Sequence, residues 1–222
     1  MRLRDEILKA TETALIDYRT ESNLALRPQL LVNDYQNGNK VLCDIITGLN
    51  NCDEFLISVA FITDGGIEPL LQSLKELEDK GIKGRILTTD YLDFSEPKAL
   101  KRLMAFTNIT IKVYSKNKEG FHTKGYIFKK GDSYKIIVGS SNLTAAALTK
   151  NKEWNVQLTS AVEGELSRNI AHEFEMMWQK ANDLTEEWIT TYEEIYKQQR
   201  EITRLKKFLQ SLSISWNPIE CK

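Results

Sequence analysis

Short apolar runs alternate with amphipathic segments along most of this chain, and this alternation limits the fold more than any other feature. Residues 54–61 form a nearly continuous apolar run, which is typical of a central strand covered on both faces. Residues 67–80 carry leucines at helical spacing and are followed by Gly81, a common helix terminator. Further strands are expected at 83–89, 108–114, 125–128, 134–138 and 155–160, and further helices at 4–19, 40–49 and 97–105. The pattern predicts an α/β fold, a mixed sheet with helices on both faces.

The strands expected at 125–128 and 134–138 should form a tight hairpin. The segment between them contains Gly131 and other residues that tolerate unusual backbone angles. If the chain folds back about Gly131, His122 lies roughly opposite Ser140. The residues just before the first strand and just after the second are therefore predicted to meet at one end of the sheet.

Several chemically active side chains lie at that predicted end. Side chains alternate between faces along a strand, so His122 and Lys124 should point the same way. Asn142 follows the second strand, and Gly139 should leave room for a ligand to approach the backbone. With Glu153, these residues bring an imidazole, an ammonium, a carboxamide and a carboxylate within about thirty residues. This set is what cleavage of a phosphodiester without a metal requires.

Each of these features also has an ordinary explanation. A lone histidine before a strand is often a surface or packed residue. A Ser-Ser-Asn run after a strand is often a helix cap, here for a helix at 145–148. It is their combination at hairpin spacing that favours a functional site.

The same residues resemble the motif of the phospholipase D superfamily, HxK followed by GSxN and a later carboxylate. The matching residues are His122, Lys124, Gly139, Ser140, Asn142 and Glu153. The chain resembles in particular the nuclease-like branch, which carries one motif per chain. Residues 58–62, 85–91 and 151–155 look like the phospholipase D-like domain at the N-terminus of certain bacterial superfamily II helicases and restriction-type proteins. The resemblance covers roughly residues 25–195 and implies an α/β/α sandwich.

The resemblance also implies a mechanism and a substrate class. His122 would attack phosphorus to form a phosphohistidine, while Lys124 and Asn142 hold the non-bridging oxygens. Glu153 would accept a hydrogen bond from the other ring nitrogen of His122. Ser140 or Ser141 would add a hydroxyl or backbone donor. No metal or other cofactor is expected, because lysine supplies the positive charge, and the expected activity is that of a DNA endonuclease.

One position departs from the superfamily pattern. The motif usually continues HxKxxxxD, and the position that matches the aspartate is Lys129. We expect Lys129 to contact substrate as part of a lysine group near the motif. The group consists of Lys112, Lys116, Lys118, Lys124, Lys129, Lys130 and Lys135. Such a group would attract a phosphate backbone, although a solvated strand face is the simple alternative.

Two other function classes remain open, and Lys129 together with the near-neutral net charge favours the first of them. The chain could be a non-catalytic DNA-binding or dimerisation module of a helicase or restriction system. An enzyme acting on phospholipids is the third class, and neither a second motif nor an amphipathic basic helix supports it.

The mechanism needs two histidines, and the motif supplies one. The other histidine of the chain, His172, lies off the apolar stripe of its expected helix and has no lysine two residues later. We therefore expect His172 to be a surface residue. The missing half of the site is predicted to come from a second copy, in a twofold homodimer with the two His122 side chains face to face.

The chain divides into three expected parts: an N-terminal helix at 1–24, the phospholipase D-like catalytic domain at 25–182, and a helical extension or linker at 183–222. Acidic and basic residues alternate in the last part, as expected of a helix whose exposed face carries ion pairs. In the resembling proteins a helicase motor follows such a segment, so a fused or associated motor is a possible partner. No Walker-type loop is present in the sequence, so ATP hydrolysis is not expected.

Composition adds limits rather than a function. A hydrophobic content of 41% and a net charge of −1 are ordinary for a globular protein, and no apolar run approaches a membrane span. The first residues lack a signal-peptide core, so a cytoplasmic location without membrane contact is the default. Cys43, Cys52 and Cys221 show no metal-ligand spacing, and Cys43 and Cys52 are expected in the core.

Overall fold

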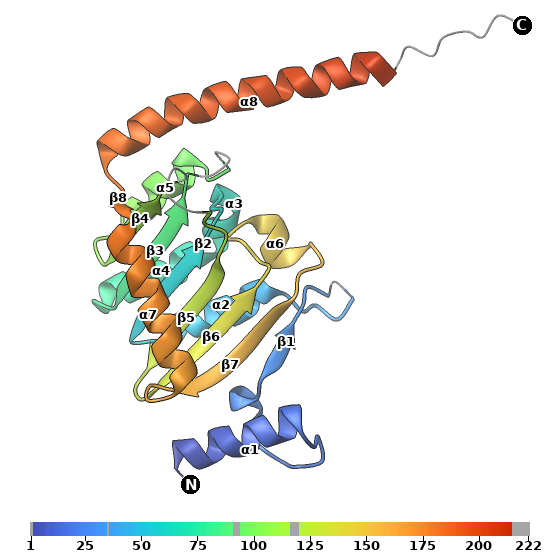
Figure 1. Ribbon diagram of the computed structural model, residues 1–222, viewed down its shortest axis with the longest axis vertical. Coiled ribbons are helices and arrows are strands. Elements are labelled where there is room, and N and C mark those ends of the chain that lie inside the picture. The colour runs from blue at the N-terminus through green and yellow to red at the C-terminus, as the bar shows by residue number, and fades with distance from the viewer. Residues whose placement is uncertain (1, 35, 91–93, 116–119, 215–222) are drawn as a thin grey trace, which may run out of the picture.

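The computed structural model describes residues 2–34, 36–90, 94–115 and 120–214, and these form a mixed sheet flanked by helices (Figure 1). The sheet has eight strands in the order β1-β7-β6-β5-β2-β3-β4-β8. The strands are β1 (Gln29–Leu31), β2 (Glu54–Val59), β3 (Lys83–Thr89), β4 (Ile109–Tyr114), β5 (Lys124–Lys130), β6 (Ser133–Gly139), β7 (Asn155–Ala161) and β8 (Asn182–Asp183). Strands β2, β3 and β4 run parallel, and the other pairs are antiparallel.

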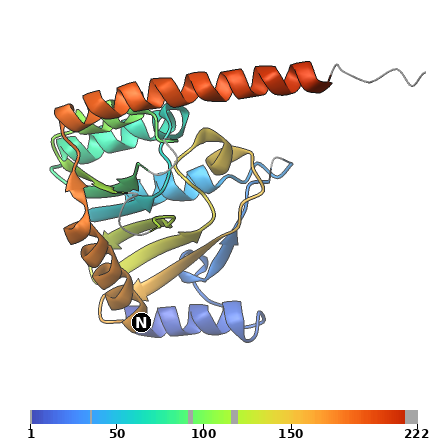
Figure 2. The same cartoon turned by 45° about the horizontal axis from the view of Figure 1, so that its top comes forward.

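Helices cover both faces of this sheet, as the sequence pattern predicted. Helix α7 crosses one face, while α2, α4 and α5 lie on the other (Figures 1 and 2). The helices are α1 (Leu3–Leu15), α2 (Val41–Asn50), α3 (Asp64–Ile67), α4 (Leu71–Asp79), α5 (Pro97–Met104), α6 (Ala145–Thr149), α7 (Glu165–Lys180) and α8 (Glu186–Ile214). In the described ranges, none of these helices is both long and apolar enough to cross a membrane.

The continuous apolar run of β2 is explained by the two separate cores that the sheet divides. Phe55 and Ile57 point into the larger core, with the buried faces of α2, α4 and α5. Leu56 points to the opposite side and packs in the core formed with Phe174 and Trp178 of α7. Because successive residues face opposite sides of a strand, β2 needs apolar residues at nearly every position.

The helix expected at 67–80 begins earlier and is divided. The Thr63 hydroxyl accepts a hydrogen bond from the Gly66 amide and caps α3. A 3-10 turn over Glu68–Leu70 then separates α3 from α4. Pro69 lies in this turn and has no amide hydrogen to continue the α-helical pattern. Gly81, with φ of 67°, follows the end of α4 as predicted.

Two short edge strands, and the burial of the first turns of α8 in the main core, were not expected from the sequence. Strand β1 pairs with β7 and strand β8 pairs with β4, one at each edge of the sheet. The first turns of α8 belong to the main core, where Ile189 and Tyr192 are buried. Cys52 is buried as expected, but Cys43 is exposed on α2, so the core placement of Cys43 was wrong.

Candidate active site

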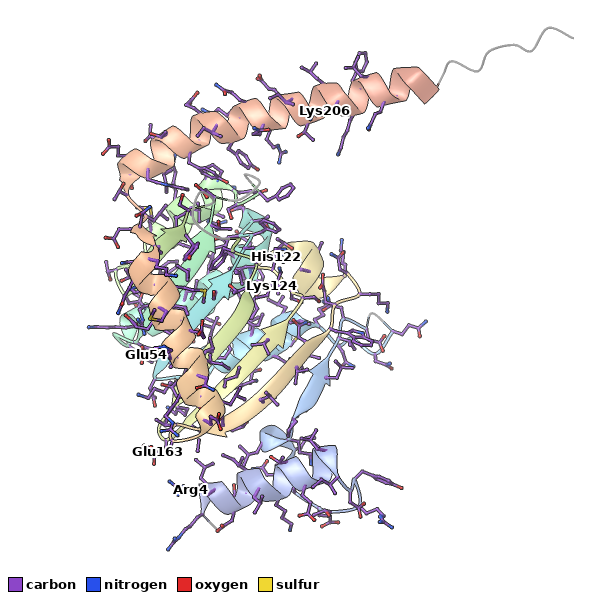
Figure 3. The ribbon with its side chains drawn as sticks, in the orientation of Figure 1. Arg4, Glu54, His122, Lys124, Glu163 and Lys206 are labelled. Carbon is purple, nitrogen blue, oxygen red and sulfur yellow. The ribbon has the colours of Figure 1, made fainter. Side chains whose placement is uncertain are left out.

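Four strand ends meet at one end of the sheet, and the predicted site residues lie there. The carboxyl end of β2 is level with the start of β5, because Val59 pairs with Lys124. The end of β6 is level with the start of β7, because Gly139 pairs with Asn155. His122 and Lys124 lie at the start of β5 in Figure 3. The convergence expected from the hairpin is therefore present.

The hairpin register differs from the expected one by a single residue. Lys130 pairs with Ser133, so the turn consists of Gly131 and Asp132 rather than being centred on Gly131. Continued beyond the strand ends, this register places Thr123 opposite Ser140. The Thr123 hydroxyl lies 2.6 Å from the Ser58 hydroxyl on β2, so it helps fasten β5 to its neighbour.

His122 is exposed at the surface of this end of the sheet. Its ring meets the Phe61 ring edge-on, with centroids 6.1 Å apart. Within the described part of the chain, neither ring nitrogen has a hydrogen-bond partner. A ring that is held by an aromatic contact but keeps both nitrogens free can attack, or accept a proton from, a bound ligand.

Lys124 is partly buried beside His122, and its ammonium donates a 2.8 Å hydrogen bond to the His122 carbonyl. Burial lowers the pKa of Lys124 below the usual lysine value, and the charge of Glu153 opposes this effect. The electrostatic contact places Glu153 near Lys124 even though 29 residues separate them in the sequence.

Asn142 is oriented by the backbone of the loop after β2. Its side-chain oxygen accepts a 3.2 Å hydrogen bond from the Phe61 amide, which fixes which end of the carboxamide is the donor. The Asn142 side-chain nitrogen has no partner among the described residues and remains available to a ligand. The cap of α6 is Thr144, whose hydroxyl accepts from the Ala147 amide. Helix capping therefore does not account for Asn142.

Glu153 is held by Ser140 rather than by His122. The Ser140 hydroxyl donates to the Glu153 carboxylate and also accepts a 3.1 Å hydrogen bond from the Trp154 amide. Asn151 contacts the other carboxylate oxygen at 3.4 Å. The hydrogen bond between Glu153 and His122 that the resemblance implied does not occur among the described residues. The loop conformation has paired the carboxylate with the nearer serine.

Ser141 supports the site through buried hydrogen bonds. It is fully buried, and its hydroxyl accepts a 2.9 Å hydrogen bond from the buried Asn155 side chain. Its carbonyl accepts from the Tyr126 hydroxyl at 3.0 Å, and burial raises the pKa of Tyr126. A ligand cannot reach the Ser141 side chain, so its expected contact with substrate is not supported. Sequence patterns gave Asn155 and Tyr126 no such supporting role.

Lys129 does not join the other site residues. It pairs with Glu54 at the opposite end of β5, roughly 16 Å along the strand from Lys124 and on the other face. The wider lysine group is also dispersed: Lys130 pairs with Asp53, and Lys112 lies over the Trp178 ring. The expected basic ring was therefore wrong for the described lysines, while Lys116 and Lys118 lie outside the described residues.

Gly139 is required for strand packing, and it also lines the cavity beside His122 and Lys124. A Cβ atom at this position would lie 2.2 Å from the Trp154 carbonyl oxygen and 2.5 Å from the Asn155 Cα. Neither distance is tolerable, so the space beside Gly139 on that side is filled by the β7 backbone. This packing brings the chain before β7, including Glu153, close to the end of β6.

A cavity of about 440 Å³ opens beside His122 and Lys124. Its other wall is formed by α7, through Ile170, Met177 and neighbouring residues. The sequence assigned these apolar residues to the core, and nothing in their spacing distinguished a cavity wall from a core face. His172 is exposed on the same helix and does not line the cavity, as expected.

Together these groups suit a phosphate ester better than most other ligands. The ammonium of Lys124 and the amide of Asn142 have the chemistry to donate to non-bridging oxygens, and an imidazole such as the His122 ring can act as a nucleophile. Among the described residues, no three histidine, cysteine or acidic side chains cluster in a way that could hold a metal ion.

Comparison with known proteins places this geometry in a family. The family model described as "Cardiolipin synthase, PLD-like domain" matches residues 45–178, more than half of the chain. NucT from Helicobacter pylori has a similar structure, with 18% identity, a TM-score of 0.56, and coverage of 71% of this chain and 99% of NucT. Nuc from Salmonella typhimurium, a phospholipase D family member, gives 17% identity, a TM-score of 0.56 and the same coverage values.

A third solved structure is similar over part of its length. Phosphatidylserine synthase from Haemophilus influenzae Rd KW20 is 14% identical, with a TM-score of 0.55, and the match covers 88% of this chain and 51% of that protein. No curated protein matches the sequence significantly. These likenesses establish the fold, and the family model covers both halves of the HxK and GSxN motif. The chain therefore belongs to the phospholipase D-like family.

Proposed function

We propose that this chain is a phosphodiesterase that cleaves DNA, with His122 as the nucleophile and no requirement for a divalent metal. The observation that carries the proposal is the free imidazole of His122 at the same strand ends as the Lys124 ammonium and the unpaired Asn142 amide. The family and the fold support a phosphodiesterase or nuclease in general. DNA as substrate, the covalent intermediate and the pairing of two copies are parts of the proposal.

In the first step, a neutral ring nitrogen of His122 attacks phosphorus, and the bond from phosphorus to the leaving oxygen breaks. That oxygen takes a proton from an acid on the opposite side. In the second step, water attacks the phosphohistidine, the bond from phosphorus to nitrogen breaks, and the same acid receives a proton from the water. Lys124 and Asn142 hold the non-bridging oxygens and stabilise the charge that develops on them.

The acid is the part of the mechanism that one chain does not provide. His172 is exposed on α7 and lies outside the cavity that His122 lines. A second copy, with its own His122 facing the first across a twofold axis, would supply the missing imidazole. The exposed position of His122 is compatible with such an approach.

Two observations favour a nuclease over the other function classes. The match with NucT and with Nuc covers 99% of each of those proteins, so each corresponds to the one motif-bearing domain found here. Phosphatidylserine synthase matches over 51% of its length. The non-catalytic alternative drew on Lys129 and on the near-neutral net charge, and Lys129 lies at the far end of β5, away from the reacting groups.

The direct test is plasmid cleavage in the presence of EDTA. We expect cleavage by the wild type and a loss on the order of 10³-fold or more in His122→Ala. His172→Ala is the matched control, because it removes the other histidine of the chain from an exposed helix position and should keep full activity. Parallel incubation with cardiolipin and phosphatidylglycerol vesicles tests the lipid alternative. Turnover of lipid without DNA cleavage, or no reaction by the wild type on either, would contradict the proposal.

The shared site is tested by mixing chains. Wild type and His122→Ala chains are unfolded together and refolded at varied ratios, so that they pair at random. If each working site needs two His122 residues, activity follows the square of the wild-type fraction, and an equal mixture retains roughly a quarter. A linear dependence would show that one chain carries a complete site.

A further inference from the structure

Helix α8 has two faces with opposite surroundings. Its first turns enter the main core through Ile189 and Tyr192, and the remainder passes over the domain and projects beyond it (Figures 1 and 2). The side turned toward the domain is lined by polar and charged residues that border hollows beside 94–98. These residues include Tyr196, Arg200, Thr203, Arg204 and Lys207.

The opposite side of α8 carries an apolar stripe with nothing covering it in the described part of the chain. Ile195, Ile202, Leu205 and Leu209 form the stripe, with exposed fractions of 40%, 44%, 61% and 62%. At 100° per residue, these four side chains lie about half a turn away from Arg200, Arg204 and Lys207. The polar side of the helix therefore faces its own domain, and the apolar side faces outward. An amphipathic helix that packs only on its own domain has the opposite orientation.

We propose that the apolar stripe of α8 pairs with the same stripe of a second copy of this chain, as a parallel two-stranded coiled coil. The spacing is that of a heptad repeat, with Ile195, Ile202 and Leu209 seven residues apart. In the sequence, Gln198 and Leu205 occupy the second seam position, three residues after Ile195 and Ile202. Isoleucine at the first seam position with leucine at the second favours two parallel strands, and Ile202 with Leu205 has this combination.

Charge complementarity favours a second copy as the occupant. In this heptad assignment, Glu201 and Lys206 flank the seam, five residues apart, and Glu201 also borders a hollow beside 94–98. Both are exposed, and neither forms an ion pair with another described residue (Lys206 is labelled in Figure 3). In a parallel pair, Glu201 of each copy faces Lys206 of the other, so the twofold axis creates the contact twice.

This proposal does not rest on catalysis, and it concerns a surface separate from the His122 site. It explains why a helix whose first turns are buried continues for several turns with apolar residues facing solvent. It would be a second contact between copies, distinct from the shared site, because the stripe faces away from the domain that carries His122.

The first experiment measures the mass of the full chain in solution by light scattering. We expect the double variant Ile202→Asp, Leu205→Asp to have half the mass of the wild type. Thr203→Asp is the matched control, because it adds an acidic residue to the polar side of the same helix segment and should keep the wild-type mass. Circular dichroism checks that the domain of the double variant stays folded, as expected for exposed positions. A monomeric wild type, or a double variant with the mass of the wild type, would overturn the proposal.

The second experiment tests the direction of the helices. In a Cys43→Ser, Cys221→Ser background, Gln198→Cys should form a disulfide-linked dimer on mild oxidation, because parallel helices bring this seam position opposite itself. Thr203→Cys should not cross-link. Reversal of either flanking charge, Glu201→Lys or Lys206→Glu, should weaken the dimer several-fold, and both together should restore it. Absence of the Gln198→Cys cross-link, or equal weakening by the paired reversals, would exclude the parallel arrangement. Wild type and double variant that are both dimers would overturn this pairing and leave the shared His122 site intact, whereas a monomeric wild type would overturn both proposals.

Discussion

The ammonium of Lys124 donates a 2.8 Å hydrogen bond to the backbone carbonyl of His122, two residues earlier. This contact bends the lysine side chain back along its own strand toward the proposed nucleophile. The ammonium is partly buried there, and burial lowers its pKa while Glu153 acts in the opposite direction. The lysine therefore loses its proton at a lower pH than an exposed lysine would.

The lowered pKa of Lys124 predicts the alkaline limit of the reaction. Catalysis requires the ammonium form, which is lost as the pH rises through a pKa below the ordinary value of 10.5. Arginine stays protonated far into the alkaline range, so Lys124→Arg should move the alkaline limb of kcat/KM to higher pH, even if its maximum is lower. Lys130→Arg is the control, since Lys130 pairs with Asp53 at the other end of β5. If the alkaline limb of kcat/KM stayed at the same pH in Lys124→Arg, a group other than Lys124 would be responsible for it.

Asn142→Asp should remove a phosphate donor without disturbing the loop. A carboxylate oxygen can still accept the hydrogen bond from the Phe61 amide, so the fold should persist. The variant loses the amide donor and places a negative charge against the phosphate. We expect kcat to fall on the order of 10²–10³-fold, as for the loss of one donor to a developing oxyanion.

The control for this loss is Asn50→Asp, the same substitution at an exposed position on α2. Steady-state kinetics of the two variants separate a local effect from a general one. A small change in kcat for Asn142→Asp would show that the free amide does not contact the reacting phosphate.

The two neighbouring serines should respond differently to replacement by alanine. Ser141→Ala leaves the buried Asn155 side-chain nitrogen without its partner, and an unpaired buried group costs about 1–3 kcal/mol of unfolding free energy. Ser140 is exposed, so Ser140→Ala should change stability by less than about 0.5 kcal/mol. Urea unfolding measures both. Equal stability of the two variants would contradict the view that the buried hydrogen bonds of Ser141 stabilise the fold.

Much of the fold could be predicted because the signals are local. Strand β3 spans 83–89 as predicted, and the hairpin register is wrong by one residue. The apolar periodicity and Gly131 determine these elements within a few residues of chain. Strands β1 and β8 have three and two residues, and their pairing depends on β7 and β4 rather than on their own sequences. Edge strands this short carry no periodic pattern that could be recognised.

The site was predicted less completely, for a different reason. Strand alternation was sufficient to bring His122, Lys124 and Asn142 to one end of the sheet. The partner of Glu153 depends on the conformations of two loops, which no spacing rule determines, and the structure gives Ser140 instead of His122. Lys129 shows the opposite error, because proximity in sequence suggested a contact that an extended strand rules out.

Lys129→Asp would place the usual superfamily residue at its motif position. Its distance from Lys124 along β5, and its opposite face, predict little change in kcat/KM. Lys124→Asp provides the contrast, since the same substitution at the site should abolish activity. A large gain for Lys129→Asp would mean that this position influences the reacting groups through the sheet.

Gly139→Ala should damage stability and activity together. The new Cβ would lie 2.2 Å from the Trp154 carbonyl oxygen, so β6 and β7 must separate where Asn142 and Glu153 are attached. Overpacking of this kind costs about 1–3 kcal/mol of unfolding free energy. Because the separation moves the loops that carry Asn142 and Glu153, kcat should fall even at temperatures where the variant remains folded.

Gly131→Ala is the matched control for this last change. Gly131 has φ of 51° and open space around its Cα, so alanine there strains the backbone at about 1–2 kcal/mol without a clash. The strain lies at the far end of the same hairpin, and kcat should be preserved. Thermal unfolding and cleavage kinetics on both variants separate general destabilisation from displacement of the site. If Gly139→Ala kept its stability and raised only KM, the glycine would serve ligand approach rather than the packing of β6 against β7.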